Sequence, residues 1–184
     1  LIENVHAHHF GRDGLMLAGY AYTDTVTPFA DAYPGLHVST DTADNNDTIL
    51  TNRTVLFDNQ VLGSQFHWNG RQGFSWTGLA GLTMSDCELN YNGAGRLSSS
   101  PGSGMDIEGI GGPMRVRHGV FTDCRYLHNQ NGGVVTSPAA CLGQQFFTFT
   151  NCTLKAGSEG SALWASSRGM RFYDCQIYGQ VERM

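Results

Sequence analysis

The hexapeptide MSDCEL at residues 84–89 decides the fold, because close variants of it recur along the chain. Three variants keep the cysteine: FTDCRY (121–126), FTNCTL (149–154) and FYDCQI (172–177). Two more carry Asn in its place: LIENVH (1–6) and LFDNQV (56–61). Each hexapeptide has an apolar residue first, an acid or amide third and Cys or Asn fourth. Six occurrences of one pattern indicate a repeat protein.

The hexapeptides align two columns of side chains that we expect to point inward. The first column is Leu1, Leu56, Met84, Phe121, Phe149 and Phe172, and the second is His6, Val61, Leu89, Tyr126, Leu154 and Ile177.

A second segment follows each of the first five hexapeptides: DGLMLAG (13–19), QGFSWTG (72–78), SGMDIEG (103–109), GGVVTSP (132–138) and GSALWAS (160–166). A small residue followed by alternating side chains is typical of a short strand entered through a turn. Helical spacing is absent from these segments, and the 24 glycines disfavour long helices. The sequence therefore predicts an all-β solenoid of about six coils, with parallel strands about 4.8 Å apart.

The five cysteines lie at 87, 124, 141, 152 and 175, without the C-x₂₋₄-C pairs of a structural zinc site. Four of them occur once per repeat, so we expect an inward column of small apolar thiols, with Asn able to bond the turn backbone in the same place. Spacing alone leaves disulfides between neighbouring coils open. Cys141 lies outside the column and is either a free thiol or a contact residue.

The 184 residues suffice for one domain with a real core, and only 15% of them are charged. The net charge is −5 and Lys155 is the single lysine, so we expect neither a nucleic-acid partner nor an anionic membrane surface. No apolar run is as long as a membrane span. Because the chain begins at Leu1 without an initiator Met or a signal peptide, we expect a processed chain or part of a longer protein.

These coils, and above all GSGMDIEG at 102–109, resemble the right-handed parallel β-helix of the pectin-lyase-like superfamily. That group includes polysaccharide lyases, glycoside hydrolases, epimerases and phage tailspike depolymerases. The resemblance covers residues 1–19 and about 52–184, and it implies a glycan partner and an extracellular or virion-surface location. The chain lacks the family's N-terminal capping helix, so we expect other domains, other chains or a homotrimer to cover the solenoid ends.

The fold hosts many reactions, so the reaction has to be argued from the site. The aligned second segments place Asp106 and Glu108 as the only acids in two outward columns, which are Met16, Ser75, Asp106, Val135, Leu163 and Ala18, Thr77, Glu108, Ser137, Ala165.

Residues i and i+2 of a strand hold their Cβ atoms about 6–7 Å apart. Retaining glycosidases hold their carboxyls about 5–5.5 Å apart and inverting ones about 6.5–9.5 Å apart, so this pair suits either. One of the two carboxyls would have to stay protonated near neutral pH, which the charge of the other favours. We expect Asp106 and Glu108 to be catalytic; the alternative is that they are ordinary solubilising residues.

Ser75, Thr77 and Ser137 leave room for a bound glycan beside these acids. Long insertions flank the same face. One is a loop at about 20–50, where Tyr20 and Tyr22 would stack on sugars or simply pin the loop, and the other is AGRLSSSPGS at 94–103.

Other polar residues are weaker candidates. His6, His8 and His9 lack a convergent third ligand, with His6 expected inward, so we expect no metal there. Asp13 is expected to shape a turn. The column Asp58, Asp86, Asp123 and Asp174 also fits turn chemistry, so we expect no cofactor, with Ca²⁺ at this column as the alternative.

The favoured function is glycoside hydrolysis by Asp106 and Glu108. It is preferred to polysaccharide β-elimination because the outward columns offer no basic residue and a chain of charge −5 does not attract polyanions. The alternatives are a lyase and a non-catalytic glycan-binding or structural module, such as a tailspike or adhesin shaft.

Overall fold

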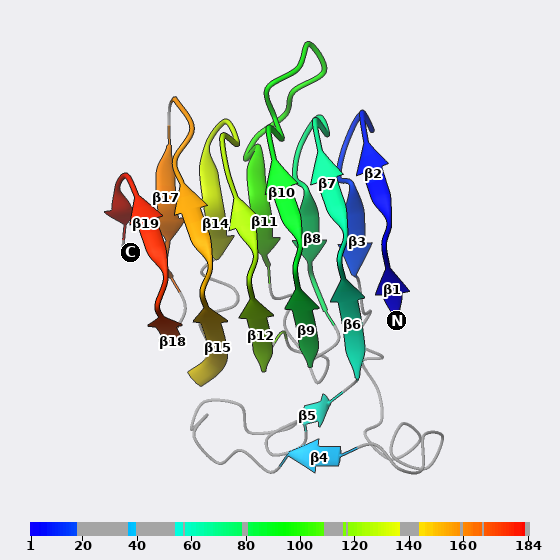
Figure 1. Ribbon diagram of the computed structural model, residues 1–184, viewed down its shortest axis with the longest axis vertical. Helices are drawn as coiled ribbons and strands as arrows, with labels where there is room; N and C mark the ends of the chain where they lie inside the picture. The colour runs from blue at the N-terminus through cyan, green and yellow to red at the C-terminus, as the bar shows by residue number, and fades with distance from the viewer. Residues whose placement is uncertain are drawn as a thin grey trace, which may run out of the picture.

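The structure is a computed structural model that describes residues 1–17, 37–39, 54–56, 58–78, 81–108, 116, 118–136, 144–158, 160–166 and 168–182. Three parallel sheets of six strands each run along a solenoid, and every coil gives one strand to each sheet (Figure 1). The predicted all-β solenoid of about six coils is therefore confirmed. In the part of the chain that the structure describes, no helix is long and apolar enough to cross a membrane.

The strands are short and regular. Sheet A contains β1 (Ile2–Glu3), β6 (Asn59–Leu62), β9 (Leu82–Ser85), β12 (Gly119–Thr122), β15 (Gln144–Thr150) and β18 (Arg168–Tyr173). Sheet B contains β2 (His6–His8), β7 (Gln65–His67), β10 (Glu88–Asn90), β13 (Arg125–Tyr126), β16 (Thr153–Lys155) and β19 (Gln176–Tyr178). Sheet C contains β3 (Leu15–Leu17), β8 (Phe74–Trp76), β11 (Ser103–Ile107), β14 (Gly132–Thr136), β17 (Ser161–Trp164) and β20 (Val181–Glu182).

The insertion of the first coil contributes one further pair of strands. β4 (His37–Ser39) pairs antiparallel with β5 (Thr54–Leu56). In Figure 1 the pair is drawn below the starts of the sheet A strands β6 and β9. Most of the predicted loop at 20–50 lies outside the described residues.

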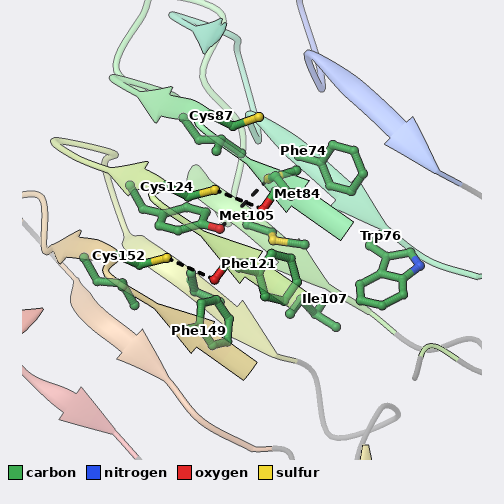
Figure 2. Packing of buried hydrophobic residues seen from close by; sticks show 14 of the residues in the cluster. Phe74, Trp76, Met84, Cys87, Met105, Ile107, Phe121, Cys124, Phe149 and Cys152 are labelled. Carbon is green, nitrogen blue, oxygen red and sulfur yellow. Dashed lines mark hydrogen bonds between the residues drawn. The ribbon is translucent and has the colours of Figure 1, made fainter. Parts of the chain in front are cut away.

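The interior is filled by side chains that stack from coil to coil. Phe121 and Phe149 stack with ring centroids 4.5 Å apart, and Phe149 and Phe172 with centroids 4.8 Å apart. Met84 and Trp76 are fully buried beside them (Figure 2). Like side chains at the strand spacing bury their apolar surface against each other, which gives each coil its register. The predicted first column is confirmed from Met84 onward.

In the first two coils the predicted columns are wrong. Sheet A pairs Ile2 with Val61, and Val61 with Met84. Val61 therefore belongs to the first column, and Leu1 is 76% exposed. The second column begins with Ala7 and Phe66, which are buried, whereas His6, predicted to point inward, is exposed.

The physical reason lies in the turn between sheets A and B. Its first residue has a positive φ in every coil: Asn4 (55°), Gly63 (54°), Asp86 (53°), Asp123 (55°), Asn151 (53°) and Asp174 (52°). Asn, Asp and Gly are the residues that adopt this left-handed conformation most easily. The predicted alignment put Asn59 in the cysteine column and Asp58 before it, but the structure uses Gly63 and Ser64 there.

This turn also has a constant length. In every coil five positions separate the core residue of sheet A from that of sheet B, as from Met84 to Leu89 and from Phe121 to Tyr126. The connections that lead into and out of sheet C vary instead.

The predicted thiol column lies directly after this turn. Cys87, Cys124 and Cys152 are buried and free, and Cys175 is half-buried and free. The thiol of Cys124 donates to the backbone oxygen of Met84 at 3.6 Å, and that of Cys152 to the oxygen of Phe121 at 3.5 Å (Figure 2). These four thiols are structural and form no disulfide. Cys141 lies outside the described residues.

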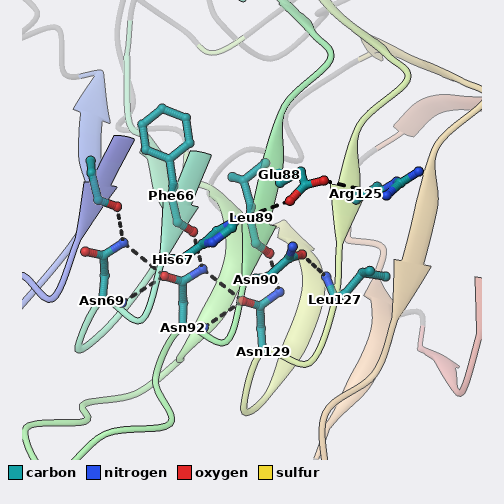
Figure 3. Close-up of polar contacts among 11 residues, drawn as sticks. Phe66, His67, Asn69, Glu88, Leu89, Asn90, Asn92, Arg125, Leu127 and Asn129 are labelled. Atoms are coloured by element: carbon teal, nitrogen blue, oxygen red, sulfur yellow. Dashed lines mark hydrogen bonds and ion pairs between the residues drawn. The ribbon is translucent and has the colours of Figure 1, made fainter. Parts of the chain in front are cut away.

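A second ladder, made of asparagines, closes the turn between sheets B and C. Asn69, Asn92 and Asn129 are completely buried. Nδ2 of Asn69 donates to Oδ1 of Asn92 at 3.0 Å, and Nδ2 of Asn92 to Oδ1 of Asn129 at 2.9 Å (Figure 3). Each Nδ2 also donates to a backbone oxygen, so the amides satisfy the turn as well as each other. The sequence predicted such a ladder in the cysteine column, and the structure places it one turn later.

Candidate active site

Sheet C carries the acidic residues that the sequence singled out. Asp106 lies in β11, paired with Ser75 of β8 and Val135 of β14, as predicted. Its neighbours in the strand, Met105 and Ile107, belong to the core, so the Asp106 side chain points away from the interior. Asp106 is nevertheless only 4% exposed, which makes it a buried carboxyl group rather than a solubilising one.

The predicted column is wrong in the fifth coil. Val134 pairs with Leu163 and Val135 with Trp164, one residue later than expected. The turn before β17 is longer by one residue, since Leu154 and Leu163 are nine positions apart whereas Tyr126 and Val134 are eight apart.

One more strand extends the column beyond the fifth coil. β20 pairs Glu182 with Trp164, so Glu182 is a second acid in the outward column of Asp106 and a third across the two columns. The prediction that Asp106 and Glu108 are the only acids of the two columns is therefore also wrong.

Polar side chains from the turns that precede β3 and β8 complete the site. Nε2 of Gln72 donates to Oδ2 of Asp106 at 2.7 Å. Arg71 and Ser75 belong to the same coil as Gln72, and both contact Asp13 of the first coil. The hydroxyl of Ser75 donates to Oδ2 of Asp13 at 3.0 Å, and Nη1 of Arg71 lies 3.5 Å from the same oxygen. Asp13 is thus part of a charged cluster and not only a turn residue, and a basic side chain does lie at the site.

Sequence reasoning missed Arg71 and Gln72 because it read only the strand positions. The signal was present in the repeat itself. The tripeptides RDG (12–14) and RQG (71–73) occupy the same place before two successive strands of sheet C. Two polar residues before a glycine at equivalent positions indicate side chains that stack on one face of a solenoid.

The surroundings hold Asp106 in its protonated form. The pKa of Asp106 is raised from its ordinary value of 3.8 to about 7, mainly by burial and in addition by the negative charges of Glu108 and Asp13. The charge of Arg71 and the hydrogen bond from Gln72 act in the opposite direction. Because desolvation is the largest cause, Asp106 keeps its proton up to near-neutral pH.

Glu108 follows β11 directly. Its N–H donates to the oxygen of Trp76 at 2.9 Å, and the residue is half-buried. Thr77 is 4% exposed, and its hydroxyl lies 3.4 Å from the backbone oxygen of Leu17. The hydroxyls of Thr77 and Ser75, both predicted to bind substrate, therefore contact protein atoms. The other predicted binding residues, Ser137, Tyr20 and Tyr22, lie outside the described residues.

Two buried polar atoms, one in Gln72 and one in the strand of Asp106, have no hydrogen-bond partner among the described residues. They are Oε1 of Gln72 and Oγ of Ser103. The two residues are neighbours in adjacent coils, since the N–H of Gly73 donates to the oxygen of Ser103 at 3.1 Å. Buried polar groups are nearly always bonded, so these atoms are places where an internal water molecule would be bound.

The other polar candidates lie on sheet B and its turns. Asp86 and Asp123 line a polar cavity of about 540 Å³ together with Glu88 and Arg125, and Nδ2 of Asn151 donates to Oδ1 of Asp123. Across the described ranges, no group of three or more His, Cys, Asp or Glu side chains is arranged to hold a metal ion. Ca²⁺ at the Asp column stays a prediction, and Asp58 does not belong to that column.

Fold and site together define a parallel β-helix with a buried acid on one of its sheets. The chain belongs to the family described as the right-handed β-helix region, whose family model matches residues 1–177. The family membership confirms the fold that the sequence resemblance implied. Comparison with the curated proteins found no match, and comparison with the solved structures found none either.

Proposed function

We propose that this chain is a glycan-cleaving β-helix protein in which Asp106 is the proton donor. The observation that carries the proposal is the burial of Asp106 with a hydrogen bond from Gln72 and a pKa of about 7. A general acid works best when its pKa lies near the working pH, and burial is the usual way to raise the pKa of a carboxyl group.

Glu108 supplies the second carboxylate. In the cleavage step Asp106 gives its proton to the glycosidic oxygen, and the bond from that oxygen to the anomeric carbon breaks. Glu108 either attacks the anomeric carbon or takes a proton from the water molecule that attacks it. The strand spacing, about 6–7 Å between Cβ atoms, accommodates both routes.

Polysaccharide β-elimination is the second candidate, and Arg71 is the observation that favours it. Elimination requires a base to remove a proton next to a carboxylate, with a cation nearby to neutralise that carboxylate. The sequence argument against a lyase rested on the absence of a basic residue, but Arg71 lies at the site. Hydrolysis remains the better candidate because the charge of Arg71 is already paired with Asp13.

Mass spectrometry of a glycan panel after incubation with the protein tests both candidates. Hydrolysis gives products that have gained one water molecule, and elimination gives products with an unsaturated end. Asp106→Asn and Glu108→Gln should each lower turnover by about 10²–10⁴-fold. Glu182→Gln is the matched control, because Glu182 lies in the outward column of Asp106 but three coils further on.

Unchanged turnover in both Asp106→Asn and Glu108→Gln would remove the site assignment. Binding of a glycan without any product would assign the chain to the non-catalytic, glycan-binding class.

A further inference from the structure

A column of exposed rings follows sheet B. Trp68, Tyr91 and His128 occupy equivalent left-handed turn positions, with φ of 58°, 59° and 57°. The rings of Trp68 and Tyr91 are 4.5 Å apart and nearly parallel at 5°, and those of Tyr91 and His128 are 5.1 Å apart at 12°. Tyr91 is therefore covered on both faces, whereas Trp68, which is 47% exposed, is covered on one face only.

The uncovered face of Trp68 points toward the first coil, because Tyr91 belongs to the coil on the other side. His9 occupies the equivalent position of the first coil, with φ of 60°. Its ring instead meets that of His8 edge-on at 5.1 Å, with the two Nδ1 atoms 2.8 Å apart. No other described ring stacks on the free face of Trp68. A cavity of about 270 Å³ lies between the first two coils, lined by His6, His8, His9, Gln65, His67 and Trp68.

The walls of this cavity carry donors and no acid. Four of the six lining side chains are imidazoles, and none is a carboxylate. The nearest acidic partner is Glu88 of β10, whose Oε2 lies 3.7 Å from Nε2 of His67 and whose Oε1 lies 3.6 Å from Nη1 of Arg125 of β13 (Figure 3). Burial lowers the pKa of His67. The cavity is thus neutral when its imidazoles are neutral and positive when they are protonated.

We propose that this cavity binds a single anionic sugar ring, with the ring lying on the free face of Trp68 and its carboxylate on the imidazoles of His8 and His67. An indole face is a good platform for the C–H face of a sugar, and protonated imidazoles are strong donors to a carboxylate. Ligand pockets start at about 300 Å³, so this cavity accepts one ring rather than a longer segment. The inference does not depend on Asp106, since the cavity lies on sheet B.

Two ligands that differ only at one carbon test the proposal. Methyl β-glucuronoside carries a carboxylate where methyl β-glucoside carries a hydroxymethyl group, and NMR titration at pH 5.5 and pH 7.5 measures both affinities. Histidine is the side chain whose charge ordinarily changes between pH 5 and 8, and the protonated ring is the stronger donor to a carboxylate, so the glucuronoside should bind about tenfold more tightly at the lower pH. The glucoside should bind weakly and equally at both values.

Three variants locate the site. Trp68→Ala and His8→Gln should each weaken binding of the glucuronoside by at least about tenfold. His128→Gln is the matched control, because it removes an exposed imidazole of the same ring column on the far side of Tyr91, and its affinity should equal that of the wild type. Far-UV circular dichroism shows whether each variant is folded. If Trp68→Ala does not fold, His8→Gln decides.

Three results would overturn the proposal. The first is no binding of the glucuronoside at either pH, and the second is equal affinity for the two glycosides. The third is binding that needs added Zn²⁺, which would assign the imidazoles to a metal. Loss of glycan cleavage in Asp106→Asn with unchanged binding of the glucuronoside would show that the two sites are independent.

Discussion

Replacement of Asp106 by Asn should make the protein more stable at neutral pH. The pKa of Asp106 is about 7 in the folded chain against an ordinary value of 3.8, so the folded state holds a proton that the unfolded state has already lost. Each pKa unit is worth about 1.36 kcal/mol, so the wild type loses roughly 4 kcal/mol as the pH rises from about 4 to about 7. Asn has no proton to lose, and its amide oxygen still accepts the hydrogen bond from Gln72.

The measurement is urea unfolding of both proteins at pH 5, 6 and 7, followed by tryptophan fluorescence, to which the buried Trp76 contributes. The free energy of unfolding of Asp106→Asn minus that of the wild type should grow by about 2–3 kcal/mol over this range. Taking the difference removes the contributions of the titrating groups that do not interact with Asp106. Asp174→Asn, at an exposed left-handed turn, is the control for removing one surface charge. A difference that stays constant from pH 5 to pH 7 would refute the argument that burial keeps Asp106 protonated.

Three further predictions follow from the same structure. Glu108→Gln should lower the pKa of Asp106, because the charge of Glu108 is one cause of its elevation. The ¹³C chemical shift of the Asp106 carboxyl group, followed against pH, measures this pKa, and an unaltered pKa would contradict the coupling. Gly73→Ala should destabilise the chain by several kcal/mol, because the added Cβ would lie 2.7 Å from the backbone oxygen of Gly104. A melting temperature equal to that of the wild type would disprove this. Reducing agent should leave the melting temperature unchanged, because the four described thiols are free, and a fall on reduction would reveal a disulfide.

The repeat was readable from the sequence where the cysteine and the turn residue occur together. Coils three to six carry both, and there the two inward columns predicted from the hexapeptides agree with the structure, as at Met84 and Phe121. In the first two coils the alignment of residue types gave the wrong columns. The turn requires a residue with a left-handed backbone conformation and not one particular side chain. Gly63 meets that requirement as well as Asp86 does, yet it does not resemble Asp86 in the sequence.

The position of Asp106 was likewise predictable from the sequence, whereas its burial and its hydrogen-bond partner were not. Alternation along a strand is enough to place Asp106 on the outer face of sheet C. Its burial, and the hydrogen bond from Gln72, depend on contacts between coils that are 34 residues apart in the sequence. The fifth coil shows the same limit, since one extra residue in a turn moved Trp164 into the outward column in place of Leu163.

The constant spacing between sheets A and B has a practical consequence for engineering. Five positions separate the core residues of sheets A and B in every coil. The corner between these two sheets is therefore the same in all coils, and coils of different length differ only in their connections to sheet C. The coil from Val61 to Thr83 is a complete unit of 23 residues, since Met84 takes the place of Val61 one step on. A tandem duplication of this unit should lengthen the protein by one strand spacing of about 4.8 Å. Loops grafted into the connections around sheet C would then change the ligand without altering that backbone.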